Sequence, residues 1–154
     1  MNNHKHWLLV ALAAFLYSSS TLSSDSKRER QLKVKDLFIA HFQCSYYAGI
    51  AEADEYLKEE EVAEWEDLDL RHFRTGVKLA KQYYDDGLSN YHYIPEGKNI
   101  SADFFAGKEY EYWTSNARND IKMRFCPDSV SDCLWTVKTM TEYHNSNCKL
   151  LPME

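Results

Sequence analysis

Glycine and proline are scarce in this sequence, which has five glycines and three prolines among its 154 residues. These residues interrupt regular secondary structure, so their scarcity favours long helices over many short strands. The sequence also contains no internal repeat, no low-complexity tract and no proline-rich linker. We therefore predict an all-α fold, a small disulfide-linked helical bundle or array of about four helices.

Catalytic signatures are missing as well. The sequence has no Gly-x-Ser-x-Gly, no His-Glu-x-x-His and no phosphate-cradling glycine loop. It also lacks the Cys-x-x-Cys-His run that attaches haem and the paired Glu-x-x-His units of a di-iron bundle. We expect no cofactor, no metal site and no catalytic residues. Two facing carboxylates would leave no trace in the sequence, so an enzyme acting on envelope polymers is one alternative. A small-ligand or metal carrier is another.

The apolar runs are too short to cross a membrane, which takes about 20 residues. The run from Trp7 to Tyr17 has eleven apolar or aromatic residues, follows Lys5 and precedes a serine-rich stretch over 18–24. This order is typical of a cleaved secretory signal. We predict that residues 1–23 are a signal peptide and that residues 24–154 form a single helical domain. The protein would then be exported, periplasmic or secreted, with no membrane contact after cleavage.

Basic side chains are outnumbered. Lys and Arg total 18 against 24 Asp and Glu, which gives a net charge of −6. Removing residues 1–23 takes away Lys5 and no acid, leaving 17 against 24, or −7. Nucleic-acid binding depends on cations that neutralise phosphates, so we expect no nucleic-acid partner. A basic protein partner is compatible with this charge, and the sequence leaves the oligomeric state open.

The cysteines are few but even in number: Cys44, Cys126, Cys133 and Cys148. Behind a signal peptide, an even count without a Cys-x-x-Cys pair indicates disulfides rather than zinc. A helix over 129–145 would hold Cys126 and Cys148 about 25–30 Å apart, too far for a bridge. Cys133 with Cys148 would leave the tail too few residues to fold back. The remaining complete pairing is Cys126–Cys133 with Cys44–Cys148, and a single Cys44–Cys133 bridge is the main rival.

Helical periodicity predicts two helices in the first half of the chain, over about 27–58 and 61–85, with a break near Lys58–Glu61. Gly87 is suited to the left-handed conformation that often ends a helix. The expected buried stripe of the first helix is Leu37, His41, Cys44, Ala48 and Ala51. That of the second is Leu70, Phe73, Val77, Ala80 and Tyr84.

Two further helices are expected after a loop over 87–100. The third begins at Ser101 as N-cap and runs to about Arg124, and the fourth covers about 129–145. The third helix should bury Ala102, Ala106, Tyr110, Trp113, Ala117 and Ile121. The fourth should bury Val130, Cys133 or Leu134, Val137, Met140 or Thr141, and His144. We expect core packing or surface exposure, rather than metal binding, for the histidines.

Two surface features are candidate partner-binding sites. Residues 52–69 hold ten carboxylates against the single base Lys58. A solvated helix face and a helix start explain most of them, since the dipole favours acids there. The functional hypothesis is that four of them dock a basic partner: Glu59, Glu60, Glu61 and Glu64. The second candidate is the aromatic loop with Tyr91, His92 and Tyr93, because tyrosine is enriched where proteins meet partners.

In size, predicted signal, helices and acidity the chain resembles small exported bacterial proteins, including periplasmic immunity proteins that neutralise secreted toxins. No shared motif accompanies this resemblance, so it assigns no functional residues. The function we expect is that of an exported, non-enzymatic protein-interaction module, with an inhibitor or immunity-type binder as one form of it.

Overall fold

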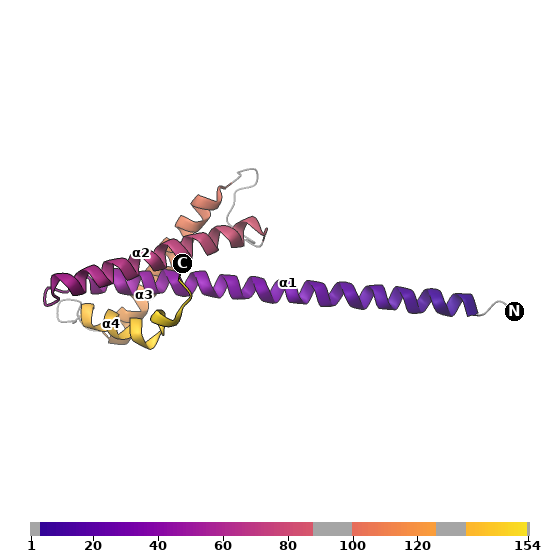
Figure 1. Ribbon diagram of the computed structural model, residues 1–154, viewed down its shortest axis with the longest axis horizontal. Helices are drawn as coiled ribbons and strands as arrows, with labels where there is room; N and C mark the ends of the chain where they lie inside the picture. Colours follow the sequence, from indigo (N-terminus) through magenta and orange to yellow (C-terminus); the bar gives the residue numbers. More distant parts are fainter. Residues whose placement is uncertain (1–3, 88–99, 126–134, 154) are drawn as a thin grey trace. The chain divides into compact units, whose positions relative to one another are not determined.

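The computed structural model describes the backbone of residues 4–87, 100–125 and 135–153, and side chains from Ser26 onward except Lys27. The chain divides into two compact units, Met1–Lys33 and Val34–Glu154. The described residues form four α-helices and one short 3-10 helix, with no strand among them (Figure 1). The predicted all-α class is therefore confirmed. The predicted signal-peptide boundary stays a prediction.

The first helix, α1, covers His4–Ala51 and so begins and ends earlier than expected. In the first unit its exposed side chains pair along the helix, as Lys33 does with Glu29 at 2.8 Å. The helix stops at Ala51 because the following residues form turns organised by Asp54. The Asp54 carboxylate accepts hydrogen bonds from the Tyr56 backbone N–H at 2.9 Å and the Thr136 hydroxyl at 2.6 Å. Such local side-chain bonds compete with a helix.

The second helix, α2, covers Glu59–Asp85, and α3 covers Ala102–Phe125. Both agree closely with the predicted bounds. Gly87 follows α2 with a φ of 71°, as expected for a left-handed helix end. The Ser101 hydroxyl accepts a hydrogen bond from the Phe104 N–H at 3.1 Å, which confirms Ser101 as the N-cap of α3.

The C-terminal part contains α4, Trp135–Asn145, and the 3-10 helix η1, Cys148–Leu150. The expected start of the fourth helix, near Ser129, lies outside the described residues. Two polar contacts hold α4 in place besides Thr136–Asp54. Arg124 of α3 pairs with the buried Glu142 at 3.1 Å, and Tyr143 bonds to His72 of α2 at 2.9 Å.

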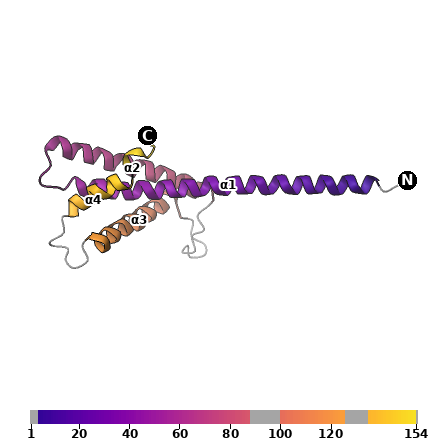
Figure 2. The same cartoon turned by 90° about the horizontal axis from the view of Figure 1, so that it is seen from below.

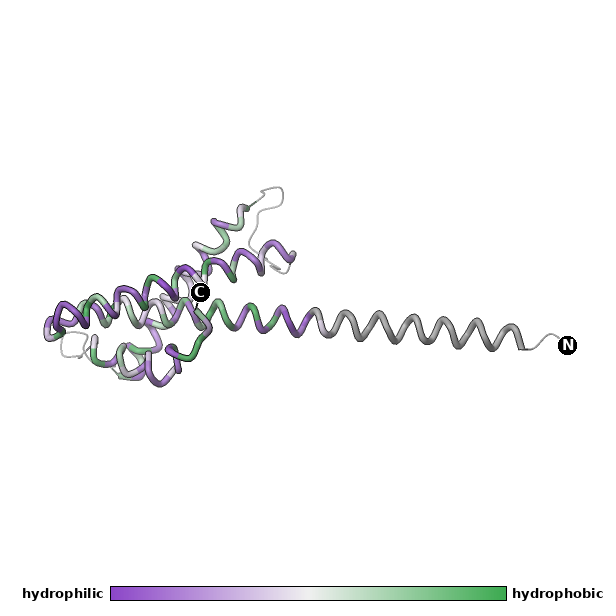
Figure 3. The backbone as a smooth tube through the Cα atoms, in the orientation of Figure 1, coloured by the Kyte–Doolittle hydropathy of each residue, from purple (hydrophilic) through white to green (hydrophobic). Residues whose placement is uncertain are grey.

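In the second unit, α2 runs antiparallel to the C-terminal part of α1, with α3 against both (Figures 1 and 2). Hydrophobic and hydrophilic residues alternate along α2 in Figure 3, as expected of a helix with one buried face. The buried side chains form two clusters. The first joins α1, α2, α3, α4 and η1 through Cys44, Tyr47, Ala48, Leu68, Ala117, Ile121, Tyr143 and Cys148. The second joins α1, α2 and α3 through Phe38, Phe42, Ala80, Phe105 and Ala106.

The predicted buried stripe of α1 is confirmed except at Leu37, which is only partly buried. That of α3 is confirmed at Ala106, Ala117 and Ile121, whereas Ala102, Tyr110 and Trp113 are partly buried. The predicted stripes of α2 and α4 are partly wrong. Leu70 and Phe73 are 42% and 37% exposed, and Val137 is 45% exposed. The buried residues of α2 are instead Leu68, His72, Thr75, Gly76 and Ala80, and those of α4 are Thr139, Glu142 and Tyr143. On α2, small and polar residues form much of this face, and at Gly76 the Phe42 ring of α1 comes too close for a larger side chain.

The cysteine pairing is confirmed in its long-range part. Cys44 and Cys148 form a disulfide with Cα atoms 5.7 Å apart, so the rival bridge from Cys44 to Cys133 does not form. Both bridged cysteines are buried. Cys126 and Cys133 lie outside the described residues.

Gly76 marks a close approach between α1 and α2. A Cβ atom there would lie 2.7 Å from the Phe42 ring and 3.3 Å from the His41 Cβ. We expect Gly76→Ala to lower the free energy of unfolding by about 1–3 kcal/mol, because the Phe42 ring is itself buried and must shift. Urea denaturation measures the change.

The matched control is Gly107→Ala in α3, where a Cβ meets no atom within 4 Å. Alanine there should raise the free energy of unfolding by about 0.5–1 kcal/mol through helix propensity alone. If both variants gained stability alike, the close approach at Gly76 would be wrong.

Opening the Cys44–Cys148 bridge should destabilise the protein. It spans a sequence separation of 104 residues, and a loop of that size makes a disulfide worth about 3–5 kcal/mol. The double variant Cys44→Ala/Cys148→Ala should lose that amount of stability in urea denaturation. Because this variant has no Cys44–Cys148 bridge to reduce, reductant should not lower its stability further through this bridge. Unchanged stability of the double variant would contradict the assigned role.

Candidate functional site

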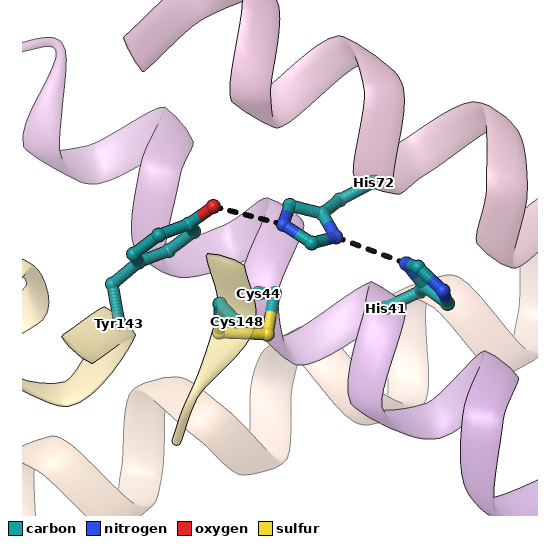
Figure 4. Close-up of a disulfide and its surroundings, with 5 residues drawn as sticks. All are labelled: His41, Cys44, His72, Tyr143 and Cys148. Atoms are coloured by element: carbon teal, nitrogen blue, oxygen red, sulfur yellow. Dashed lines mark hydrogen bonds between the residues drawn. A yellow bond between two sulfur atoms is a disulfide. The ribbon is translucent and has the colours of Figure 1, made fainter. Parts of the chain in front are cut away.

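The most unusual cluster of side chains lies in the core between α1 and α2. His41 and Ser45 are four residues apart on α1, and Asp69 and His72 are three apart on α2, so each pair shares a helix face. Because the helices run antiparallel, His41 meets His72 and Ser45 meets Asp69. The two Nδ1 atoms of the histidines are 2.9 Å apart (Figure 4). The Ser45 hydroxyl donates to the Asp69 Oδ1 at 2.5 Å.

Tyr143 of α4 extends the histidine pair into a chain of three buried side chains. Its hydroxyl lies 2.9 Å from the His72 Nε2, on the opposite edge of the ring from His41 (Figure 4). All three side chains have no solvent exposure. We call His41, His72 and Tyr143 the histidine–tyrosine chain. It links three helices, and the Cys44–Cys148 bridge lies beside it.

The direction of these hydrogen bonds follows from counting donors. If Tyr143 donates to the His72 Nε2, the His72 Nδ1–H donates to the His41 Nδ1, and only the His41 Nε2–H lacks a partner. In the opposite direction, both the hydroxyl hydrogen of Tyr143 and the Nε2 of His41 lack a hydrogen-bond partner. The His41 Nε2 is buried and unpartnered among the described residues. Since unsatisfied buried polar groups are costly, we assign the first direction.

Burial keeps all three side chains of the histidine–tyrosine chain neutral. It lowers the pKa of His72 to about 4, with further lowering by His41 and by Arg71. Burial also lowers the pKa of His41. The backbone of Pro152 opposes this change by a smaller amount, although no hydrogen bond forms between it and the His41 Nε2. Burial raises the pKa of Tyr143 to about 12, so its hydroxyl keeps the proton that it donates.

The neighbouring Ser45–Asp69 pair contains a carboxyl group whose surroundings disfavour its charged form. Burial raises the pKa of Asp69, and the hydrogen bond from Ser45 opposes this change. Burial likewise raises the pKa of Glu52, helped by the nearby charges of Asp69 and Glu66. Asp69 and Glu52 are therefore two neighbouring carboxyl groups whose pKa values are both raised. Neither Asp69 nor Glu52 lines the surface hollow of about 550 Å³ on α2.

The structure brings together only some of the residues expected to bind a partner. Glu59, Glu60, Glu61 and Glu64 are all exposed in the first two turns of α2. Glu61 also accepts a hydrogen bond from the Lys58 backbone N–H at 2.9 Å, and Glu64 pairs with Lys149 at 3.5 Å. The aromatic loop residues Tyr91, His92 and Tyr93 lie outside the described residues.

Sequence reasoning placed His41 on the buried face of its helix but missed its pairing with His72. The available signal was the three- and four-residue spacing of polar residues on each helix. His41 and Ser45 on one helix and Asp69 and His72 on the next are complementary only when the helices run antiparallel. Tyr143 carried no comparable signal, because it lies 71 residues from His72 in the sequence.

Among the described residues, no group of three or more His, Cys, Asp or Glu side chains is arranged to hold a metal ion. Nor does any described helix have the length and apolar character needed to cross a membrane. No family model, curated protein or solved structure matches the chain.

The histidine–tyrosine chain should make folding sensitive to acid. A histidine whose pKa is lower in the folded state stabilises the fold fully above its unfolded pKa, near 6.5, and loses this contribution as the pH falls. For His72 the loss falls between pH 6.5 and about 4, and it amounts to about 2–3 kcal/mol. His41 adds to it. The raised pKa values of Asp69 and Glu52 act in the opposite direction and offset part of the loss.

The measurement is the free energy of unfolding in urea at pH 7.5 and 4.5. His72→Phe should flatten the difference between the two pH values even though it lowers stability overall. His144→Gln, which alters an exposed histidine of α4, should leave the difference as it is in the unmodified chain. If the unmodified protein and both variants showed the same pH dependence of stability, the role of the histidine–tyrosine chain would be refuted.

Proposed function

We propose that this chain is an exported protein-interaction module without catalytic chemistry of its own, which docks a basic protein partner through the acidic start of α2. An inhibitor or immunity-type binder is the form of such a module that we favour. The carrying observation is the exposure of Glu59, Glu60, Glu61 and Glu64 on the first two turns of one helix.

The surroundings of these carboxylates support the proposal. Among the described residues, no cation pairs with Glu59 or Glu60, so their charge is available to a partner. Glu61 is committed in part to the helix start, and Glu64 has a single contact at 3.5 Å with an exposed lysine. Exposed ion pairs of this kind contribute little, so a basic partner could displace Lys149 at small cost.

The buried polar groups support a binding role over a catalytic one. The histidines and Tyr143 have no solvent exposure and bond to one another. A substrate could reach them only if α4 moved away. The polar contacts of α4 to α2 and α3, together with the Cys44–Cys148 bridge that joins η1 to α1, suit a scaffold that presents a fixed surface.

Partner capture tests the proposal. The chain, immobilised and exposed to a native envelope extract, should retain a basic protein that 0.5 M NaCl releases, because salt screens exposed charges. Glu59→Gln/Glu60→Gln should weaken this capture at least about tenfold. Mass spectrometry of the bound fraction identifies and quantifies the partner.

The matched control is Asp85→Asn/Asp86→Asn, which removes the same charge from the other end of α2, where both residues are exposed. It should capture the partner as the unmodified chain does. Equal loss of partner capture in both variants would show that the effect comes from net charge alone. No loss of capture in either variant would reject the acidic start of α2 as the binding surface. Alanine at Tyr91, His92 and Tyr93 tests the aromatic loop in the same assay.

A further inference from the structure

The charges of α2 are separated along its length. Residues 59–69 contain seven carboxylates and no Lys or Arg. The rest of the helix carries four cations, Arg71, Arg74, Lys78 and Lys81. A single helix of this acidic protein therefore holds both an acidic and a basic half.

Four of these charges lie in one line on the outward side of the helix. Glu60, Asp67, Arg74 and Lys81 follow one another at seven-residue spacing, which returns to nearly the same side of an α-helix. The buried His72, Gly76 and Ala80 lie roughly on the opposite side by the same geometry. The buried Leu68 and Thr75 lie about 100° round the helix from Asp67 and Arg74. Along the outward line, two acidic residues are therefore followed by two basic residues.

A line of apolar residues accompanies the charges. Ala63, Leu70 and Val77 also follow at seven-residue spacing, each three residues after a member of the charged line. Leu70, at the middle of the helix, is 42% exposed. Alternate spacings of three and four are those with which one helix packs against another. Ala63 and Leu70 are exposed, whereas Val77 packs in part against the second core cluster.

The basic half of this face is hollowed. A hollow of about 550 Å³ runs along it and is lined by Phe73, Arg74, Val77, Lys78, Lys81, Gln82, Asp85 and Asp86. Its two apolar side chains, Phe73 and Val77, and its three cations suit an occupant that has both apolar and acidic side chains. Asp85 and Asp86 lie at the far end, beyond the last cation.

We propose that the occupant is a second copy of this chain, packed antiparallel along α2 about a two-fold axis between Leu70 and Arg71. In this register Glu60 of each copy meets Lys81 of the other, and Asp67 meets Arg74. The small Ala63 falls opposite Lys78 and next to Val77, over the hollow. The two Leu70 side chains flank the axis. The arrangement is closed, because a two-fold contact uses the same surface on both copies.

The existing ion pairs of these residues do not prevent the contact. Lys81 pairs with Asp103 of α3, and Arg71 lies 3.6 Å from Asp67. The side chains of all four are at least 38% exposed, and exposed pairs exchange partners at little cost. Lys78 also has an interaction of its own, and the proposed register does not depend on its being free.

This inference extends the proposed function, because it identifies a basic partner surface on the protein itself. The contact rests mainly on exposed charges, so we expect a weak dimer that salt dissociates. Sedimentation velocity of the chain as isolated from the cell, at about 100 µM, should show a dimer at 20 mM NaCl and a monomer at 0.5 M NaCl.

Charge reversal tests the register directly. Glu60→Lys/Asp67→Lys makes the outward line entirely basic, and Arg74→Glu/Lys81→Glu makes it entirely acidic. Each variant alone should weaken dimerisation at least about tenfold through repulsion. An equal mixture of the two should restore a dimer that contains one copy of each, which also shows that both variants fold.

Three results would overturn the inference: a monomeric unmodified chain at 20 mM NaCl, undiminished dimers of each variant alone, or no mixed dimer. These outcomes differ from failure of the proposed function. Arg74→Glu/Lys81→Glu keeps Glu59 and Glu60, so it should still capture a foreign basic partner. Capture by a monomeric chain would reject only the dimer, whereas dimers without capture would reject only the foreign partner.

Discussion

The contact between His41 and His72 determines how α1 and α2 can pack. The two rings meet in the core at 2.9 Å, and both are fully buried. Sliding either helix by one turn, about 5.4 Å, would leave both imidazoles buried without this bond, and an unsatisfied buried polar group costs about 1–3 kcal/mol. Apolar contacts alone would tolerate such a shift more easily. The polar pair therefore selects one register among several that bury similar apolar area.

The rest of the second unit depends on that register. It brings Gly76 beneath the Phe42 ring and leaves the Nε2 of His72 directed at Tyr143, so that α4 docks where it completes a hydrogen bond. Cys44 lies one turn from His41 on α1, which places the disulfide to Cys148 at the same end of the unit. A covalent link and a neutral hydrogen-bonded chain thus hold the C-terminal segment against the same stretch of α1.

Much of this fold was predictable from the sequence, and the failures share a physical cause. Gly87, Ser101 and the Cys44–Cys148 pairing followed from local rules of helix ends and from the limited reach of a disulfide. The exposed Leu70 and Phe73 were assigned to the core because apolar periodicity ignores how near a neighbouring helix comes. Where two helices approach at Gly76, space favours glycine, threonine and alanine over leucine. The histidine–tyrosine chain escaped prediction because its partners come from three helices that only the tertiary packing brings together.

The helix dipole explains part of the charge separation along α2 but not its outward pattern. The dipole favours acids in the first turn and bases in the last, and its effect fades within that turn. Glu60 lies in the first turn of α2, where the dipole accounts for it, whereas Lys81 precedes the last turn, which contains no basic residue. Asp67 and Arg74 lie about two turns or more inside the helix, where the dipole gives no reason to prefer either sign. Nor does it explain why an exposed leucine lies midway between them. A surface that complements itself about a two-fold axis accounts for both features, because its charges must change sign across the axis and Leu70 then lies opposite the aliphatic stem of the other copy's Arg71 beside the axis.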